Sequence, residues 1–425
     1  MVLASIIIPA FNRSELLELT LKSLENQLEA RFEVIIADHG STDDTKSVAN
    51  KFQGRLNLRY LYVPRRHLTP GEPRNCAAKL SESNLLIFVD SGIVVPCHYV
   101  QSHVRFHQES ESSIGIGYYH GHECDRTEWF SGDFLKQLEK IEEVITMDPE
   151  IRDPRFNDAL SGGVPLSQLC LPWVYCWSGN MSVSRDAFQK VGGFDLSLKF
   201  MFEDNDLAYR LHSMKINLKY VYDGWAFELP HDRDSPPKRF TDAYAACTLS
   251  YSKHKSLELE AYLLANLNAI RAEKIYRHLS TLSEAYKPTN FDLVEPYINR
   301  GNPTLFIGGG ESELKYVDQV TTSEPNYKSN NKLWSCSGIK LPNIEGNFGT
   351  VIVGNLWTRL GLPINSERTS LIDLLIKELK LKAETVIFLD YGLNHEKVAN
   401  KYTIDKKILQ HFCNKNGLSV YHVRV

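Results

Sequence analysis

Short apolar runs alternate with helical patterns over the first 90 residues of the chain. Each run is rich in Ile, Val and Leu, which is typical of parallel strands that are covered on both faces. Between the first two runs, Asn12 and Glu15 form a capping pair, and leucines from Leu16 to Leu28 follow helical spacing. The pattern predicts an α/β fold with right-handed crossovers, whose ligands bind beyond the carboxyl ends of the strands. The predicted strands are residues 5–8, 32–37, 58–63 and 84–89.

The pattern becomes less regular in the middle of the chain. Residues 112–171 include a helix predicted near residues 134–145 and a Pro- and Gly-bearing stretch at 154–165, which is typical of binding loops. A second regular block, residues 177–222, is followed by a charged, Pro-rich loop at 231–239. These irregular stretches are therefore candidates for ligand contacts.

A second α/β pattern follows a helical section. Helical patterns without strand signals extend from residue 242 to residue 286, and a Pro-bearing boundary comes after them. The strands predicted beyond it are residues 304–307, 350–353, 385–389 and 418–423. The predicted division is an α/β domain at residues 1–240, a helical linker section at residues 241–300, and a small Rossmann-like α/β domain at residues 301–425.

The composition is that of a globular protein and excludes several classes. Of 425 residues, 43% are hydrophobic and 24% charged, and the formal net charge of -4 provides no basic field for nonspecific nucleic-acid binding. No apolar run approaches the ~18 residues that span a bilayer, and the start of the chain lacks the basic n-region of a signal peptide. The eight cysteines show no C-x-x-C pair or zinc-ligand spacing. We therefore expect a cytoplasmic protein with reduced thiols, no transmembrane segment and no nucleic-acid partner.

Polar side chains follow the ends of the predicted strands. Asn12 follows the first strand, Asp38 the second and Asp90 the fourth, and Arg74 lies at the start of a helix between them. Asp38 can accept from the imide N–H of a uracil, and Asp90 can bind ribose hydroxyls or a metal. The guanidinium of Arg74 is a planar, permanently charged fork that can neutralise these carboxylates or a diphosphate. Together these residues predict a pocket for a nucleoside diphosphate.

Seven short motifs follow one another in the first part of the chain. They are IIPAFN at 7–12, ADHGS at 37–41, PRN at 73–75, FVDSG at 88–92, WSGNMSV at 177–183, GGFD at 192–195 and FEDNDL at 202–207. In this order they resemble glycosyltransferase family 2, which has the GT-A fold. The last three resemble the galactosyltransferase-type carboxy-terminal block of bacterial chondroitin-polymerase-like enzymes and, more distantly, of polypeptide N-acetylgalactosaminyltransferases. The resemblance covers about residues 1–240 and leaves the rest of the chain unassigned.

The resemblance implies a nucleotide-sugar-dependent hexosyltransferase that inverts the anomeric carbon of a UDP-sugar. It implies that Asp204 takes the acceptor proton as general base, with Glu203 in reserve. The alternative for both carboxylates is that they only complement the dipole at the start of a helix. The donor-binding residues that the resemblance implies are Pro9, Phe11, Asn12, Asp38, Arg74, Asp90, Ser91, Gly92 and Gly179.

Two positions depart from the family pattern. The family usually holds a divalent metal, Mn2+ or Mg2+, with a D-x-D motif, but Gly92 replaces its last acid, so a hard-cation site has lost an oxygen ligand. His231 falls where some relatives place a histidine ligand; it could compensate together with Asp90, or it could be a surface residue. His39 stands where the family usually has a second Asp, which weakens the inference of uracil specificity. Metal dependence is therefore left open.

Aromatic side chains beside the WSGNMSV motif are candidates for acceptor binding. Trp173, Tyr175 and Trp177 alternate along one face of a predicted strand, where they can form an apolar platform for a sugar or peptide, or belong to the core. Trp177 and Asn180 are the acceptor-binding residues that we expect. The histidines of the YHGH segment at 119–122 could line the pocket or end a surface strand.

The last domain contains a glycine loop directly after a predicted strand. Gly308, Gly309 and Gly310 form this loop, Glu324 lies near the end of a second predicted strand, and Asp390 ends a later one. This arrangement resembles the opening of the class I methyltransferase fold, in which such residues hold S-adenosylmethionine. However, only about ten residues separate the loop from the next strand, fewer than a crossover helix with its loops requires. We therefore expect a degenerate methyltransferase-like domain that serves acceptor recognition or dimerisation.

The leading hypothesis is an inverting glycosyltransferase that moves a sugar from a UDP-sugar to a hydroxyl, or a thiol, of a glycan, peptide or small natural product. One alternative is a catalytically impaired scaffold that binds nucleotide sugars, although the retained Glu203–Asp204 pair argues against it. A second alternative is a bifunctional glycosyltransferase and methyltransferase. The C-terminal domain is also a candidate for oligomerisation.

Overall fold

The computed structural model describes most of the chain. The described residues are 1–110, 112–122, 151–155, 164–199, 201–286, 289–323, 329–342, 347–364, 369–391, 404 and 406–424. Contacts divide the chain into two compact units, Met1–Ala246 and Cys247–Val425. Most of the predicted helical section falls in the second unit, and its separation as a third part stays a prediction. The helix expected near residues 134–145 and Glu324 lie outside the described residues.

The first unit is built on a seven-stranded sheet in the order β3-β2-β1-β4-β8-β6-β9. The pairs among β1, β2, β3 and β4 are parallel, whereas β8 runs antiparallel to both β4 and β6. The predicted apolar runs form the first four strands, and the polar side chains expected at their carboxyl ends lie there. The strands are β1 (Ala4–Ala10), β2 (Phe32–Asp38), β3 (Leu58–Tyr62), β4 (Leu85–Val89), β6 (Ser113–Ile116), β8 (Asn180–Ser184) and β9 (Asn217–Tyr220).

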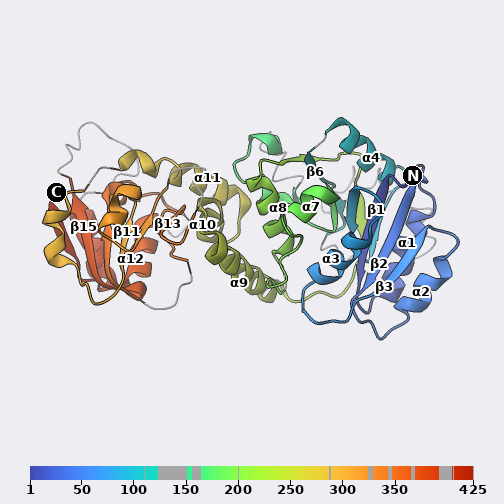
Figure 1. The fold of residues 1–425 in the computed structure, drawn as a ribbon, viewed down its shortest axis with the longest axis horizontal. Coiled ribbons are helices and arrows are strands. Elements are labelled where there is room, and N and C mark those ends of the chain that lie inside the picture. Colours follow the sequence, from blue (N-terminus) through green and yellow to red (C-terminus); the bar gives the residue numbers. More distant parts are fainter. Residues whose placement is uncertain are drawn as a thin grey trace. The chain divides into compact units, whose positions relative to one another are not determined.

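Helices cover both faces of this sheet. The helices are α1 (Ser14–Leu24), α2 (Thr45–Phe52), α3 (Gly71–Leu80), α4 (Tyr99–Glu109), α7 (Arg185–Lys190) and α8 (Glu203–Ser213). Figure 1 shows α1 and α2 on one side of the strands and α3 on the other. Leu21 of α1 and Val48 of α2 belong to the same buried cluster as Ile8 of β1, which fixes the strand ends relative to both helices.

Two local predictions in the first unit are wrong. Helix α1 begins at Ser14 rather than directly after Asn12, because the Asn12 side chain is engaged by Thr42 of the neighbouring loop and cannot cap the helix. The segment that carries Trp173 and Tyr175 is not a strand but a 3-10 helix, η3 (Pro172–Tyr175), which begins at a proline. Another short 3-10 helix, η2 (Leu166–Gln168), precedes it.

A small second sheet closes the carboxyl edge of the first. It has three strands in the order β5-β10-β7. These strands are β5 (Ile93–Val94), β10 (Ala226–Glu228) and β7 (Tyr119–His120). Because β5 follows the FVDSG motif and Leu229 donates its N–H to the carbonyl of Gly92 at 2.8 Å, the loop after β10 is tied to the end of β4.

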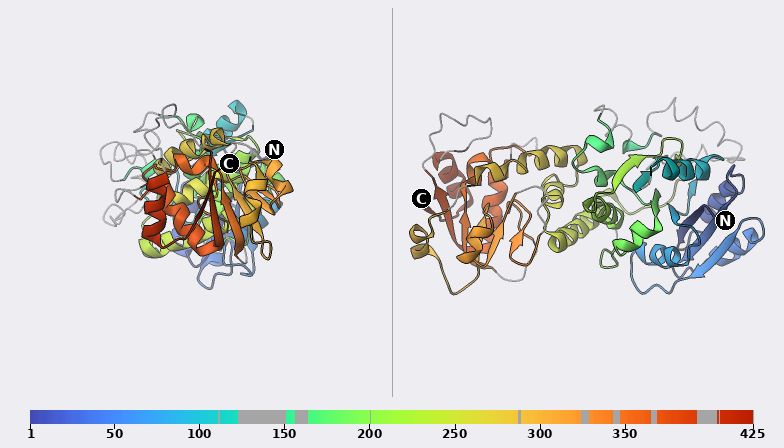
Figure 2. Two further views of the ribbon diagram at one scale, coloured as in Figure 1. Left: turned by 90° about the vertical axis from the view of Figure 1, so that its left-hand side faces the viewer. Right: turned by 45° about the horizontal axis from the view of Figure 1, so that its top comes forward.

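The second unit contains a six-stranded sheet in the order β13-β12-β11-β14-β15-β16, with every pair parallel. Numbered within the unit, this order is 3-2-1-4-5-6, the order of a doubly wound Rossmann fold. The left view of Figure 2 shows these strands, coloured orange to red, side by side. The strands are β11 (Thr304–Ile307), β12 (Gln319–Thr321), β13 (Leu333–Trp334), β14 (Phe348–Val353), β15 (Ala383–Asp390) and β16 (Tyr421–Arg424).

Helices and short turns flank the second sheet. The α-helices that follow the first unit are α9 (Pro236–His254), which crosses the boundary between the units, α10 (Leu257–Leu264), α11 (Ala269–Leu279), α12 (Leu371–Lys382) and α13 (Lys406–Asn416). The 3-10 helices are η4 (Leu282–Ala285), η5 (Phe291–Leu293), η6 (Glu295–Tyr297), η7 (Glu311–Lys315) and η8 (Asn355–Arg359). Phe291 and Val294 pack on Phe306 and Ile352, so η5 and its neighbour cover one face of the sheet.

The predicted α/β fold class, with a mostly parallel sheet in each half of the chain, is confirmed. In the described part of the chain, no helix is both long and apolar enough to cross a membrane. None of the described cysteines forms a disulfide.

Candidate active site

The loops after β1 and β2 are joined by hydrogen bonds. The side-chain oxygen of Asn12 accepts from the N–H of Thr42 at 2.7 Å, and the N–H of Asn12 donates to the hydroxyl of Ser41 at 3.0 Å. Asn12 has a φ of 49°, a left-handed conformation that Asn tolerates better than most residues. The strand end at which we expect the donor is therefore rigid, and Asn12 maintains it.

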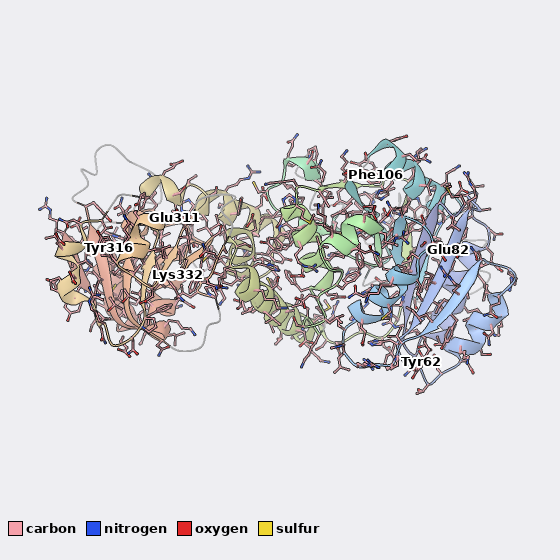
Figure 3. The ribbon with its side chains drawn as sticks, viewed as in Figure 1. Tyr62, Glu82, Phe106, Glu311, Tyr316 and Lys332 are labelled. Carbon is pink, nitrogen blue, oxygen red and sulfur yellow. The ribbon has the colours of Figure 1, made fainter. Side chains whose placement is uncertain are left out.

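Asp38 is more enclosed than the sequence suggests. Asp38 is 2% exposed. Its Oδ1 accepts from the N–H of Ser41 at 2.8 Å, and its Oδ2 accepts from the hydroxyl of Tyr60. A carboxylate retains acceptor capacity beyond two such bonds, so a contact with a uracil imide remains compatible with this geometry. Tyr62, which pairs with Asp38 in the sheet register, is exposed at the surface (Figure 3).

Phe11, directly after β1, presents an aromatic ring at the same edge. It is 38% exposed, and the guanidinium carbon of Arg65 lies 3.8 Å from its ring centroid. Such an arginine stacks on the ring through a cation–π interaction. An exposed ring and a permanent cation thus lie beside the predicted nucleotide position.

The FVDSG motif is shaped by hydrogen bonds to the strands around it. The hydroxyl of Ser91 donates to the carbonyl of Pro9 at 2.6 Å, and the N–H of Gly92 donates to the hydroxyl of Thr20 at 2.9 Å. Gly92 has a φ of 98°, in which a residue with a side chain is strained. This conformation gives a physical reason why position 92 carries no acid, and Asp90 is the motif's remaining carboxylate.

A buried arginine connects this motif with the FEDNDL motif. Arg74 of α3 is 2% exposed. Its Nη2 lies 2.5 Å from Oδ1 of Asp90, and its Nη1 lies 3.4 Å from Oε1 of Glu203. Burial opposes the charged form of Arg74, but the two carboxylates outweigh it and raise the pKa of the guanidinium. The structure therefore brings together Arg74, Asp90 and Glu203, which are far apart in the sequence. Asp204 is the residue after Glu203.

Asp204 has the geometry expected of a base. The residue is half-buried, whereas Glu203 is buried. Its Oδ2 accepts from the N–H of Ser178 at 3.2 Å, and its Oδ1 accepts from the N–H of Asn205 at 2.8 Å, so both oxygens are oriented by the backbone. Burial raises the pKa of Asp204. Burial also raises the pKa of Glu203 to about 7, and the neighbouring Asp204 adds to this shift while Arg74 opposes it.

The predicted metal ligands Asp90 and His231 have different partners. Asp90 pairs with Arg74, whereas Nδ1 of His231 lies 3.0 Å from the carbonyl of Leu229 and Nε2 lies 4.0 Å from Oε1 of Glu228. Burial lowers the pKa of His231, which favours the neutral ring that a metal requires. Over the described ranges, no three His, Cys, Asp or Glu side chains are grouped to hold a metal. The side chains of the described residues alone therefore do not complete a metal site.

A cavity of about 320 Å3 lies next to His231. Its walls come from the N-terminal turn of α1, the loop after β2 and the loop after β10, and they include three acidic residues and an arginine. The lining residues are Asn12, Arg13, Ser14, Glu15, Leu16, Asp43, His231 and Asp232. It is thus a polar space beside the predicted donor edge.

The aromatic acceptor candidates separate into two groups. Trp173 and Tyr175 are buried, at 0% and 6% exposure, and therefore belong to the core. Trp177 is partly exposed; the guanidinium carbon of Arg155 lies 4.3 Å from its ring centroid, and the ring of His122 lies 5.1 Å away. Of the three aromatics, Trp177 is thus the one at an accessible position.

Asn180 has a structural role in this geometry, and Gly179 precedes it. Both residues are buried, and the side-chain amide of Asn180 donates to the carbonyls of Tyr118 at 2.9 Å and Gly224 at 2.8 Å. Its side-chain oxygen accepts from the hydroxyl of Tyr99 at 2.8 Å. The structure therefore does not place Asn180 where an acceptor could reach it, and the motif instead fixes the start of β8.

His39 and His120 bond to other residues of the protein. Nε2 of His39 lies 3.0 Å from a carboxylate oxygen of Glu72, the same oxygen that accepts from the N–H of His67 at 2.9 Å. Although burial opposes it, these bonds lower the pKa of Glu72. His120 is buried and accepts from the N–H of Asp153 at 3.1 Å, and burial lowers the pKa of its ring to about 4. His39 and His120 therefore stabilise the loops rather than face the cavity.

An ion pair beneath Trp177 has no signature in the sequence. Asp153 and Arg155 are 0% and 2% exposed, and their side chains bond to each other. Arg155 also donates to the carbonyl of Tyr175 at 2.9 Å and to that of Gly117 at 2.9 Å. The segment has no periodic pattern, so nothing in the sequence marks this arginine as the residue that supports Trp177.

The space beside the glycine loop of the second unit is occupied by other side chains, and the N–H groups of the loop donate to the protein. Gly308 has a φ of 76°, and a Cβ there would lie 1.9 Å from a methyl group of Leu356. The N–H groups of Gly308 and Gly309 each donate to the carbonyl of Thr321 at 3.0 Å, and that of Gly310 donates to Glu313 at 2.8 Å. A methyltransferase-like loop would present these groups to its ligand, so the geometry does not favour S-adenosylmethionine binding.

Most of the first unit matches a known protein family. Residues 5–192 match the family described as Glycosyl transferase family 2. The chain carries a family 2 glycosyltransferase domain. The matched range includes Asp38, Arg74 and Asp90, whereas Glu203 and Asp204 lie beyond it. The resemblance stated from the sequence is thereby confirmed for this domain.

The relatives of this chain include a glucosyltransferase and a chondroitin synthase. Validoxylamine A glucosyltransferase of Streptomyces hygroscopicus subsp. jinggangensis is 30% identical over 266 residues, which are 61% of this chain and 63% of that protein. Chondroitin synthase of Pasteurella multocida is 25% identical over 346 residues, which are 76% of this chain and 35% of that protein. Among solved structures, residues 1–349 of Staphylococcus aureus TarS in complex with UDP-GlcNAc are 20% identical, with a TM-score of 0.45, over 67% of this chain and 76% of that one. The chain spans less than two thirds of the length of the curated relatives it matches.

Proposed function

We propose that the protein is an inverting glycosyltransferase that moves a sugar from a UDP-sugar to a hydroxyl, or a thiol, of a glycan, peptide or natural product. The observation that carries the proposal is the cluster in which Arg74 joins Asp90, at the donor edge of the sheet, to Glu203, directly before the half-buried Asp204. The names of two relatives, a glucosyltransferase and a chondroitin synthase, support the reaction class. Cytoplasmic location and oligomerisation remain predictions from the sequence.

Inversion is a single displacement at the anomeric carbon. The acceptor oxygen forms the new bond as the bond to the UDP oxygen breaks, and Asp204 takes the acceptor proton. Backbone N–H groups orient both oxygens of this carboxylate, so little reorganisation is needed at the moment of reaction. Trp177, which Arg155 supports, offers an aromatic surface for the acceptor.

A divalent metal is compatible with the proposal. Asp90 is the half-exposed carboxylate at the donor edge, and the neutral ring of His231 is the second donor that the sequence suggests. Mg2+ often binds through one or two carboxylates together with the phosphate oxygens of its substrate. Asp90 with a bound diphosphate would form such a site, in which the metal would supply positive charge to the leaving group.

The alternatives fit the geometry less well. A scaffold that only binds nucleotide sugars has no use for a base oriented by two N–H groups, as Asp204 is. A bifunctional methyltransferase is disfavoured because the glycine loop of the second unit donates to Thr321 and Glu313.

A thermal-shift screen of the full chain tests the donor. UDP, GDP, dTDP and S-adenosylmethionine are each added with Mn2+, with Mg2+ and with EDTA. A ligand at a hundredfold excess over its Kd stabilises the native state by about 2.7 kcal/mol, which raises the Tm by a few degrees. We expect this shift for UDP, little for GDP and dTDP, and none for S-adenosylmethionine. A shift with S-adenosylmethionine alone would reject the proposal, and the EDTA arm decides whether a metal is required.

The transfer rate is expected to increase as the pH rises from acid towards neutral, because Asp204 must be ionised to act as the base. The pKa of Glu203 is about 7 instead of its ordinary 4.5, and that of Asp204 is also raised. A raised carboxyl pKa means that the folded state binds more protons than the unfolded chain, so this pair stabilises the fold more at low pH than at high pH.

The loss of activity in acid should therefore not come from unfolding caused by this pair. Measurement of kcat/KM between pH 5 and 9, with the Tm recorded at each pH, checks both parts of this expectation. A rate that does not change between pH 5 and 8 would contradict the assignment of this pair.

A further inference from the structure

One face of α3 is fixed against the GGFD motif. The side-chain amide of Asn75 donates to the carbonyl of Phe194 at 2.9 Å, and its oxygen accepts from the N–H of Phe194 at 2.8 Å. A Cβ on Gly71 would lie 2.6 Å from Cβ of Phe194, so glycine is needed for this close approach. The PRN and GGFD motifs are therefore one packed unit.

Arg74 uses this fixed position to hold two carboxylates. Its Nη2 bonds to Asp90 at 2.5 Å, its Nη1 lies 3.4 Å from Glu203, and its guanidinium carbon lies 5.4 Å from the ring centroid of Phe194. The side chain is 2% exposed, and its Nε is buried without a hydrogen-bond partner. Both terminal nitrogens of the Arg74 guanidinium are thus directed at protein carboxylates, and the guanidinium is buried.

The first turn of α8 needs such support. Met201 and Phe202 have φ values of 58° and 71°, left-handed conformations that are costly for residues with large side chains. Residues held in this way persist only where their surroundings fix them, and they are concentrated at functional sites. Phe202 is buried edge-on against Trp173, at 6.2 Å between ring centroids, and Glu203 is bound by Arg74.

We propose that Arg74 is a positioning residue, which acts through Glu203 to hold Asp204 in place and links that position to Asp90, rather than binding the donor diphosphate. The inference rests on the proposed function. A misplacement of about 1 Å can cost about 100-fold in rate, so a side chain that never contacts substrate can govern turnover.

Kinetics and UDP binding distinguish the two roles. The variants are Arg74→Met, Arg74→Lys, Glu203→Gln and the double variant Arg74→Met with Glu203→Gln. For Arg74→Met we expect kcat to fall by about 100-fold, while the donor KM and the Kd of UDP change by less than about threefold. Arg74→Lys should recover part of kcat, because lysine keeps the charge but cannot bridge both carboxylates as a fork. The double variant should lose little more than either single variant, as expected of coupled residues.

Arg55→Met is the matched control, because Arg55 is 54% exposed and pairs with Glu25 away from the site. It should leave kcat, KM and Kd unchanged. A tenfold weaker affinity for UDP in Arg74→Met with kcat retained would identify Arg74 as a donor ligand and overturn the inference. Losses that add in the double variant would also overturn it, because Arg74 would then not act through Glu203.

The inference and the proposed function can fail separately. A wild-type protein that releases no UDP from any UDP-sugar would reject the proposed function. The link between Arg74 and Glu203 is then tested by thermal unfolding of the same four variants. Tm decreases that are clearly non-additive in the double variant support the link, and additive decreases reject it.

Discussion

Replacing Asp204 with Asn is expected to lower turnover by about 10²–10⁴-fold, the usual contribution of a general base. The amide has nearly the same shape as the carboxylate but cannot take the acceptor proton. UDP binding should change by less than about threefold, since Asp204 bonds to the backbone N–H groups of Ser178 and Asn205 and, in the proposed mechanism, faces the acceptor. Initial rates of UDP release and calorimetry with UDP measure the two effects.

Asp223→Asn is the matched control for this substitution. Asp223 is 61% exposed and pairs with Arg105, so its replacement should leave turnover unchanged. Full activity in Asp204→Asn would remove Asp204 from the mechanism. If Asp204→Asn retained activity and Glu203→Gln lost it, the base would be Glu203 instead.

Replacing Arg155 with Leu is expected to lower the free energy of unfolding by about 3–5 kcal/mol, the usual cost of removing one partner of a buried ion pair. The substitution would leave the Asp153 carboxylate, which is 0% exposed, without its cation. It would also remove the donors to the carbonyls of Tyr175 and Gly117. Urea unfolding followed by circular dichroism measures the change.

Arg105→Leu is the comparison for this effect. Arg105 also pairs with an aspartate, but both side chains are more than half exposed, at 58% and 61%. An exposed pair contributes about 0–1 kcal/mol, so this variant should unfold almost as the wild type does. Equal losses in the two variants would contradict the account of Arg155.

The strands and their carboxyl ends could be predicted because a buried strand requires a continuous run of apolar residues in the sequence. Strands covered on both faces must be apolar along their whole length, as β1, β2 and β4 are. The first polar residue after such a run is then at the ligand edge of the sheet. Asp90 is identifiable in this way, and the position of Asp204 follows from its motif.

The roles of single side chains could not be predicted in the same way. Asn180 stands within a motif, but its amide is saturated by two carbonyls that come from distant loops. Asp153 and Arg155 have no motif, and their importance arises only because the folded chain buries them beneath Trp177. The 3-10 helix at Trp173 begins at a proline and is buried. The alternation of aromatic residues in the sequence instead suggests a strand. Such features depend on contacts between residues far apart in the chain.

The central claim is inverting transfer from a UDP-sugar, and proton NMR of the first product tests it most directly. The protein is incubated with α-linked UDP-glucose, UDP-galactose and UDP-GlcNAc, with water as the acceptor where no other is added. We expect release of UDP from at least one of these donors, with the β-anomer of the free sugar appearing first and the Asp204→Asn variant inactive. Initial formation of the α-anomer, or no release of UDP from any UDP-sugar, would contradict it.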